Sequence, residues 1–410
     1  MNEPVPTRLS TTRTAHRAVL VVFALAGITF ATWASRLPDI KAVLDLTPGE
    51  LGVTLLAGSV GALLALPLAG RVADRVGTTG AVLIGTVLGG IGITGIGLGT
   101  EVVGSRAVVS AALLATSAGV SLWDVAMNLQ AATVERALGR SVMPLYHASF
   151  SAGTVLAALL GAALVALDVP VLLHLSLVAT FAVGVVLAAV RAFVSDPRSA
   201  VGAGEGPARS AWTERRTVLV GVFVLVAAFT EGTANDWIAV AFVEGHGVPA
   251  WAGVVAFACF LSAMTLGRVL GTRLLDRYGR VRVLAPMLLV AAVGSLLVVL
   301  APPLPAYLGT LLWGFGVSLG FPVGMSAAAD DPARATARMS VVATIGYGAF
   351  IAGPPALGFL GDHVGVLRAL LLVAVLITLA LLTLGSVAEE DESVGRRTAL
   401  DPTPKESSGR

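Results

Sequence analysis

Charged residues are scarce in this sequence. They make up 13% of the 410 residues, whereas 56% of the residues are hydrophobic and the mean hydropathy is +0.88. Soluble globular proteins carry about 25% charged residues, so this chain cannot cover its surface with groups that water solvates. The formal net charge of +2 gives no support for nucleic-acid binding. The composition therefore predicts a protein embedded in a lipid bilayer.

Cysteine is also nearly absent. The one cysteine, Cys259, lies in an apolar run, which excludes a disulfide within the chain and argues against a thiolate metal site. The sequence has no Gly-x-x-x-x-Gly-Lys phosphate loop, no His-Glu-x-x-His, and no Gly-x-Ser-x-Gly on a strand-to-helix turn. We therefore expect no ATP-driven pumping, no metal, no cofactor and no enzymatic activity, with an enzyme acting inside the membrane as an open alternative.

Long apolar blocks recur along the chain, separated by short polar stretches. A helix that rises about 1.5 Å per residue needs about 20 residues to cross the hydrocarbon core, and twelve blocks come close to that length. The expected spans are residues 18–35, 51–69, 80–98, 107–129, 144–167, 169–190, 218–242, 251–270, 283–300, 306–327, 339–359 and 369–384. The expected fold class is an all-α membrane protein with twelve transmembrane helices.

The basic residues predict how these spans are oriented. When the N-terminus is placed in the cytoplasm, only Arg36, Lys41, Arg106 and Arg368 of the 27 Lys and Arg residues fall on the outer side. Short cytoplasmic loops of membrane proteins carry an excess of basic residues. We therefore expect a multi-pass protein of the bacterial cytoplasmic (inner) membrane with both termini in the cytoplasm.

The two halves of the chain are related. The segment GRVADRVG at 70–77 follows the second span and TRLLDRYG at 272–279 follows the eighth, and GVSL recurs at 119–122 and 316–319. Nearly equal offsets at equivalent spans indicate a duplication in parallel orientation. Two pseudo-symmetric six-helix bundles are therefore expected at 18–190 and 218–386, with a cytoplasmic N-terminal tail at 1–17, a Gly- and Pro-containing linker at 191–217 and a disordered tail at 387–410.

With these halves and the box Gly-x-x-x-Asp-Arg-x-Gly after the second span, the sequence resembles the major facilitator superfamily. The box departs from the family pattern in its tail, where Thr78 and Thr79 replace basic residues. Further segments resemble the MosC-like (YbjJ-like) branch: RLPDI at 36–40, DVAMN at 124–128, ER at 135–136, YHASFS at 146–151 and EG at 231–232. The resemblance implies a transporter whose halves rock around a central site, and the branch implies a sugar-like solute.

Few ionisable side chains lie inside the expected spans, where they are costly unless they face a partner or water. Glu231 is near the centre of its span, with Asn235 one turn along the same face, and Asp124 and Asn128 repeat this arrangement in the fourth span. Each pair fits hydrogen bonding to a solute, and each acid fits a proton carrier. The alternative for Glu231 is a structural carboxyl tied to a neighbouring helix, and for Asp124 and Asn128 it is a buried polar pair that fixes a helix contact or the cytoplasmic gate.

His147, near the start of the fifth span, has a side chain suited to proton exchange, although a histidine near a helix end can also be a structural donor. Trp123 offers an apolar face beside Asp124. The superfamily's cavity is lined by its first, fourth, seventh and tenth helices, and this implies that Trp33, Trp313 and Phe321 are candidate wall residues. Ordinary packing is the alternative for each aromatic residue.

The duplicated boxes indicate a cytoplasmic gate. Charges in loops this short can bridge the halves in one conformation and separate in the other. The residues proposed for the gate are Asp74, Arg75, Glu135, Arg136, Arg140, Asp276 and Arg277.

The sequence thus predicts a secondary transporter that moves a small polar solute, sugar-like or polyol-like, by alternating access with proton coupling. Its expected partners are that solute, protons and the lipid bilayer, and it is expected to act as a monomer. Proton-driven drug or toxic-metabolite efflux fits the same features. A sensor or channel that does not transport fits them less well, because a static pore needs no gate boxes.

Overall fold

The structure is a computed structural model that describes residues 5–139, 142–194, 211–331 and 334–389. Within these ranges every regular element is helical. The N half contains α1 (Val5–Ala34), α2 (Leu37–Val43), α3 (Pro48–Glu101), α4 (Arg106–Leu138), α5 (Met143–Ala166), α6 (Val171–Ala189) and the 3-10 turn η1 (Val190–Ala192). The C half contains α8 (Arg215–His246), α9 (Ala250–Tyr278), α10 (Arg280–Leu300), α11 (Pro303–Val317), α12 (Gly320–Ala328), α13 (Ala335–Val364), α14 (Val366–Ala369), α15 (Leu371–Thr383) and η2 (Leu384–Val387).

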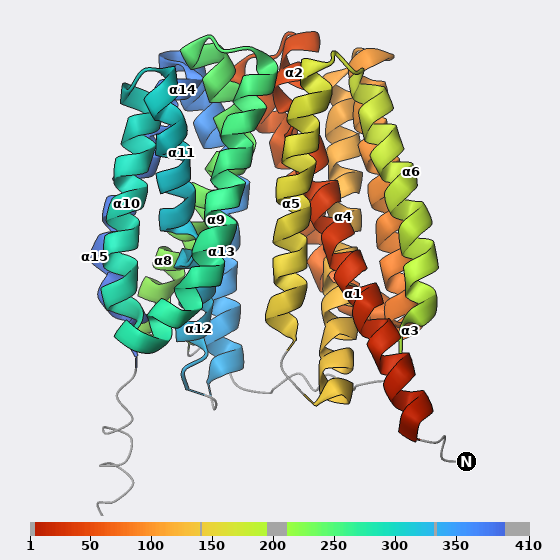
Figure 1. Ribbon diagram of the computed structural model, residues 1–410. Coiled ribbons are helices and arrows are strands. Elements are labelled where there is room, and N and C mark those ends of the chain that lie inside the picture. Colours follow the sequence, from red (N-terminus) through yellow and green to blue (C-terminus); the bar gives the residue numbers. More distant parts are fainter. Residues whose placement is uncertain (1–4, 140–141, 195–210, 332–333, 390–410) are drawn as a thin grey trace, which may run out of the picture.

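The two halves stand side by side as bundles of nearly parallel helices (Figure 1). Among the described residues, eleven helical segments are long and apolar enough to cross a membrane. The short helix α2 lies at one end of the molecule, called here the α2 end. The first described residues of α1 lie at the opposite end, called here the tail end (Figure 1). The last described residues follow η2 on the tail-end side.

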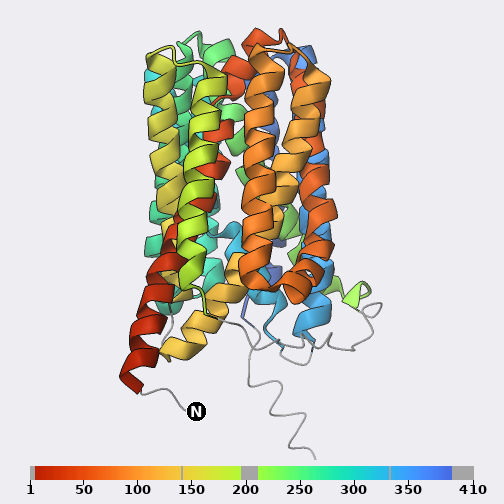
Figure 2. The same cartoon turned by 90° about the vertical axis from the view of Figure 1, so that its right-hand side faces the viewer.

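The helix α3 accounts for two crossings, which explains why eleven segments make twelve passes. Its 54 residues would extend about 80 Å as a straight helix, far more than one bilayer needs. The backbone is not helical at Gly77, where φ is 76° and ψ is 165°. The chain folds back at this residue, as Figure 2 shows for the orange helices at the tail end. The expected all-α fold with twelve passes in two bundles is confirmed.

The duplication seen in the sequence is also visible in the backbone. Gly279, which occupies in the second box the position of Gly77 in the first, has φ 78° and ψ 163°. Only glycine adopts this combination of dihedral angles without strain. Both boxes therefore make the same turn between two helices, and each turn depends on its final glycine.

Small residues allow neighbouring helices to approach closely. A side chain at Gly119 of α4 would lie 2.3 Å from the backbone nitrogen of Gly89 in α3. Likewise, a side chain at Gly294 of α10 would lie 2.4 Å from the backbone nitrogen of Trp313 in α11. Helices inside membranes gain stability from such close packing because lipid provides no hydrophobic drive for association. This packing fixes the orientation of α4 and of α11, and hence the direction of their polar faces.

Candidate functional site

The two halves are joined by polar contacts at the α2 end. The backbone N–H of Gly49, at the start of α3, donates a hydrogen bond of 2.9 Å to Oδ1 of Asp362 on α13. Lys41 of α2 forms an ion pair with Glu244 of α8. Each contact links one half to the other, and both lie at the α2 end.

Close backbone packing seals the same end. A side chain at Gly52 of α3 would lie 2.4 Å from the carbonyl oxygen of Pro354 in α13, and one at Gly358 would lie 2.5 Å from the carbonyl oxygen of Pro48. Val254 of α9 packs beside Ala162 and Val165 of α5 in a small apolar cluster. The Gly- and Pro-rich eleventh span therefore serves close packing between the halves.

Asp124 and Asn128 lie on one face of α4, as their spacing predicts. The side-chain amide of Asn128 donates to Oδ1 of Asp124 at 3.3 Å and to the Asp124 carbonyl at 2.9 Å. The Asp124 side chain is exposed to water although protein surrounds it at longer range. A side chain that is accessible and yet surrounded by protein borders a space between the helices. No basic residue contacts Asp124 among the described residues.

Glu231 has a partner that the sequence did not reveal. Nη2 of Arg268, on α9, lies 3.0 Å from both carboxylate oxygens of Glu231. In the sequence, Arg268 counts among the basic residues that mark the cytoplasmic side, but the structure places it inside α9, almost three turns before the end of that helix at Tyr278. The Oδ1 atom of Asn235, one turn along α8 from Glu231, is buried and has no hydrogen-bond partner in the structure.

Polar groups from both halves lie at similar depths. At about 1.5 Å per residue, Asp124 is about 27 Å along α4 from Arg106, and Glu231 is about 22 Å along α8 from His246, both measured from the α2 end. Tyr347 of α13 lies within range of an electrostatic interaction with Asp124. His147, which is exposed on α5, lies within range of an electrostatic interaction with Arg268. These groups come from both halves and lie at similar depth, beyond the sealed end.

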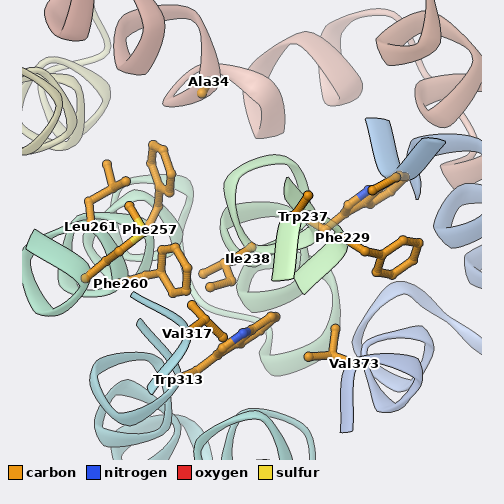
Figure 3. Packing of buried hydrophobic residues seen from close by; sticks show 14 of the residues in the cluster. Ala34, Phe229, Trp237, Ile238, Phe257, Phe260, Leu261, Trp313, Val317 and Val373 are labelled. Atoms are coloured by element: carbon orange, nitrogen blue, oxygen red, sulfur yellow. The ribbon is translucent and has the colours of Figure 1, made fainter. Parts of the chain in front are cut away.

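The tryptophans expected as cavity walls are buried in this conformation. Trp123 is 1% exposed and Trp313 is 0% exposed, so both belong to the cores of their halves. Trp313 packs edge-on against Phe260 with 5.7 Å between the ring centroids, in the cluster shown in Figure 3. Trp33 is 8% exposed, and Phe321 is partly buried against the same core. In this conformation the three tryptophans make no water-accessible wall, because helix packing turns them inward.

The residues proposed for the gate at the tail end are mostly exposed. Asp74, Arg75, Asp276 and Arg277 all lie on the surface or close to it, and neither Asp74 nor Asp276 has a hydrogen bond or ion pair in the part of the chain that the structure describes. The Arg277 guanidinium lies 5.2 Å from the ring centroid of Tyr278. The proposed bridging of the halves by these charges stays a prediction for the other conformation.

The remaining gate candidates make local contacts within the N half. The carboxylate of Glu135 accepts hydrogen bonds from the backbone nitrogens of Val142 and Met143, at 2.7 and 2.6 Å. Arg136 donates to the hydroxyl of Thr133 at 3.2 Å. Glu135 therefore fixes the turn between α4 and α5 here. Arg140 lies outside the described residues.

The C half carries an ionic network at the tail end that the sequence did not reveal. Asp330, after α12, accepts hydrogen bonds from Nη1 and Nη2 of Arg280 and from Nη2 of Arg216, each at 2.8 Å. At the matching place in the N half, Thr78 donates to Gln130 at 2.9 Å. The departure of the first box from the family pattern at Thr78 was the available signal, because it shows that the two halves hold this position by different chemistry.

No metal site is apparent. In the described ranges, no group of three or more His, Cys, Asp or Glu side chains is placed to bind an ion. A groove of about 340 Å³ lies on α9, α10 and α11 and is lined almost entirely by apolar groups, among them Leu274, Met287 and Phe315. Neither Asp124 nor Glu231 lines it, so it is not the site that the acids define.

Comparison with known proteins places the chain in a family. The model of the Major Facilitator Superfamily matches residues 19–354 and, in a second match, 251–405. The chain belongs to the Major Facilitator Superfamily. It is therefore a multi-pass membrane protein with a transporter fold, and the family expected from the boxes and the duplicated halves is confirmed.

Three curated relatives are similar over most of their length. An uncharacterized MFS-type transporter of Yersinia pestis is 31% identical over 83% of this chain and 88% of its own. An uncharacterized transporter of Sinorhizobium fredii is 31% identical over 85% and 92%, respectively. The membrane protein MosC of Rhizobium meliloti is 27% identical over 87% and 86%. The resemblance to the MosC-like branch is thus confirmed.

Solved structures share the fold. The nucleoside transporter NupG superposes with a TM-score of 0.71 at 15% identity, covering 92% of this chain and 98% of NupG. A bacterial homologue of the human lysosomal transporter Spinster gives 0.73 at 14% identity, covering 94% and 98%. The fucose:proton symporter FucP of E. coli gives 0.62 at 16% identity, covering 91% and 98%. At these identities the likeness concerns the fold.

Proposed function

We propose that this protein is a proton-coupled secondary transporter that moves a neutral sugar-like or polyol-like solute across the bacterial cytoplasmic membrane by alternating access. The tail end, which contains the first residues of α1, is the cytoplasmic side, in line with the distribution of basic residues. The α2 end is then the outer side. The conformation described is one in which the outer side is closed.

The observation that carries this proposal is the position of Asp124. It is a carboxylate that stays accessible although protein surrounds it, deep in a membrane protein and near enough to Tyr347 of the other half to interact with it electrostatically. Such a group is stable only beside water or a partner. A solute path that is closed on one side needs an accessible polar group between the two halves, and Asp124 is such a group.

The division of roles follows from the partners of the two acids. Glu231 is already paired with Arg268, whereas Asp124 has, within the described residues, a side-chain hydrogen bond only to the neutral amide of Asn128. We therefore assign the proton to Asp124, and solute hydrogen bonding to Glu231, Asn235 and Asn128. FucP is named as a fucose:proton symporter and NupG as a nucleoside transporter, and both names support a neutral, hydroxyl-rich solute for this chain.

A thermal-shift screen of the purified protein tests the solute class. The probes are L-fucose, myo-inositol and uridine as neutral polyhydroxylated compounds, gluconate as an anion and tetraphenylphosphonium as a lipophilic cation. A ligand at a hundred times its Kd stabilises the folded state by roughly 2.7 kcal/mol, so one neutral probe should raise the melting temperature. Stabilisation by tetraphenylphosphonium alone would replace this proposal with drug efflux.

Neutralising Asp124 tests the proton. In proteoliposomes, Asp124→Asn should abolish accumulation driven by an inward proton gradient, because the amide cannot carry a proton, while downhill exchange of the same solute continues. The matched control is Asp168→Asn, the same substitution at an exposed turn between α5 and α6, which should transport like wild type. Gradient-driven accumulation by Asp124→Asn at the wild-type rate would remove Asp124 from the coupling mechanism.

A further inference from the structure

Arg268 is a basic residue that lies within Ala250–Gly271, the part of α9 that is apolar enough to cross a membrane. A charged side chain in this position is costly unless it is paired, and two neighbouring elements contact Arg268. Nη2 lies 3.0 Å from each carboxylate oxygen of Glu231 in α8, and Nε donates to the carbonyl oxygen of Ser318 at 3.3 Å. One guanidinium therefore connects the polar face of α8 to the tenth span.

Ser318 marks the point where the tenth span is broken. The helix α11 ends at Val317 and α12 begins at Gly320. A break in a transmembrane helix frees backbone carbonyls, which must find other donors because lipid offers none. The bond from Arg268 supplies such a donor at the break.

The packing of α9 on this break is unusually close. A side chain at Gly267 would lie 2.3 Å from the hydroxyl oxygen of Ser318, and one at Gly271 would lie 2.4 Å from Cδ1 of Leu319. The two glycines flank Arg268 and are one helical turn apart. The two glycines let the backbone of α9 approach the break on both sides of Arg268. This close approach supports the contact between Arg268 and Ser318 independently of the hydrogen bond.

The duplicated half shows that the fold itself does not require this arrangement. The repeat places Leu66 at the position of Arg268 and Ser121 at the position of Ser318. The helix α4 continues without interruption through Ser121. A charged tether and a broken helix therefore occur together in the C half and are both missing from the equivalent place in the N half.

We propose that Arg268 is a positioning residue of the transport site, which neutralises Glu231 and ties it to the break in the tenth span. This inference rests on the proposed function. A solute hydroxyl that binds the Glu231 carboxylate in place of Arg268 frees the guanidinium from α8. The segment α12 is then free to move relative to α11, so that occupancy of the site changes the cytoplasmic part of the tenth span. Arg268 also balances the negative charge of Glu231, which suits a neutral solute.

The pair is tested without any ligand by a double-mutant cycle in lipid nanodiscs. Arg268→Gln and Glu231→Gln should each lower the melting temperature, because each leaves a partly buried charge inside a transmembrane helix without its partner. The double variant should recover most of the loss. The matched control is Arg273→Gln, at an exposed arginine of the same helix, which should melt like wild type. Losses that simply add in the double variant would overturn the pairing.

The tether to the break needs a second measurement, hydrogen exchange of the peptide that covers residues 313–325. Arg268→Gln and the double variant should raise its exchange roughly tenfold, the factor expected for the loss of one hydrogen bond to a charged donor. In the double variant the exchange of this peptide should rise although the melting temperature stays near that of wild type. A pair that only stabilised the fold would not separate these two quantities. Arg268→Lys should keep the stability but exchange faster, because an ammonium cannot make both contacts at once.

Unchanged exchange in Arg268→Gln would overturn the tether. These readouts use no solute and no proton gradient. If the wild-type protein took up none of the neutral probes, the proposed function would be contradicted. The role of Arg268 would still be decided by the melting temperatures and the hydrogen exchange.

Discussion

At the scale of single residues, Asp330 shows how charge holds the tail end of the C half together. Its carboxylate bridges Arg216, at the start of α8, and Arg280, at the start of α10. Partial burial works to raise the pKa of Asp330, but the hydrogen bonds from Arg280 and Arg216 outweigh burial and lower this pKa below its usual value. Asp330 is therefore a charged residue whose ion pairs connect the first turns of α8 and α10.

The lowered pKa of Asp330 predicts a pH dependence of stability. A group whose pKa is lower in the folded state contributes stability that is complete above its unfolded pKa, about 4, and is lost as the pH falls through the folded value. Asp330→Asn should lower the melting temperature at pH 7 and should melt closer to wild type at pH 3. The measurement is thermal unfolding in detergent between pH 3 and pH 7, and an equal gap between the two proteins at every pH would contradict it.

At the scale of elements, the fold-back of α3 decides how twelve passes are made. A single run of 54 helical residues becomes two crossings because Gly77 adopts dihedral angles that other residues avoid. The same device recurs between α9 and α10 at Gly279. The boxes recognised in the sequence are therefore first of all turn-forming segments, whatever their charges do in the transport cycle.

Gly77→Ala should destabilise the protein by about 1–3 kcal/mol, because alanine in this region of dihedral space is strained. Gly70→Ala is the matched control from the same box. Gly70 is helical and its Cβ position is open, so alanine there should be neutral or stabilise by about 0.4–1 kcal/mol. Both are measured by thermal unfolding of the purified variants. Equal melting temperatures of the two variants would show that the turn does not depend on Gly77.

At the scale of the whole molecule, the seal at the α2 end holds the two halves in the conformation described. The contacts are the Gly49–Asp362 hydrogen bond, the Lys41–Glu244 ion pair and the backbone approach around Gly52. A transporter must break this seal to reach its other state, so each contact biases the equilibrium by its own free energy. Asp362 is the most direct member, because it caps the first turn of a helix in the opposite half.

Asp362→Ala should shift the equilibrium toward opening at the α2 end by roughly tenfold, since a hydrogen bond to a charged group contributes about 1.5–3 kcal/mol. Spin labels at the exposed positions of Val103 and Leu304 should report a longer distance, and labels at Val76 and Leu274, at the tail end, a shorter one. Asp362→Asn keeps an oxygen acceptor for Gly49 and should resemble wild type.

Asp74→Asn provides a contrasting variant. Asp74 has no partner in the described part of this conformation and is proposed to pair when the tail end closes. The substitution should therefore leave the label distance at the α2 end unchanged while slowing transport. If Asp362→Ala did not alter either distance, the contact to Gly49 would have no part in the gate.

Much of the site could be anticipated from spacing alone. Asp124 with Asn128, and Glu231 with Asn235, are each four residues apart, and the period of an α-helix is enough to place each pair on one face. The aromatic residues could not be assigned in this way. Trp123 is the neighbour of Asp124 in the chain, but the helical rotation of about 100° per residue turns it into the core of the N half, where it lies against Gly85.

The sequence by itself determined the membrane class, the number of passes and the duplicated halves, because hydrophobic length, basic-residue bias and the repeated boxes are local properties of the chain. Only the tertiary structure decided which charges meet. Arg268 and Glu231 are far apart in the chain, and so are Gly49 and Asp362. No local pattern records such pairings, since they depend on how closely the helices pack and on which end of the two halves is closed.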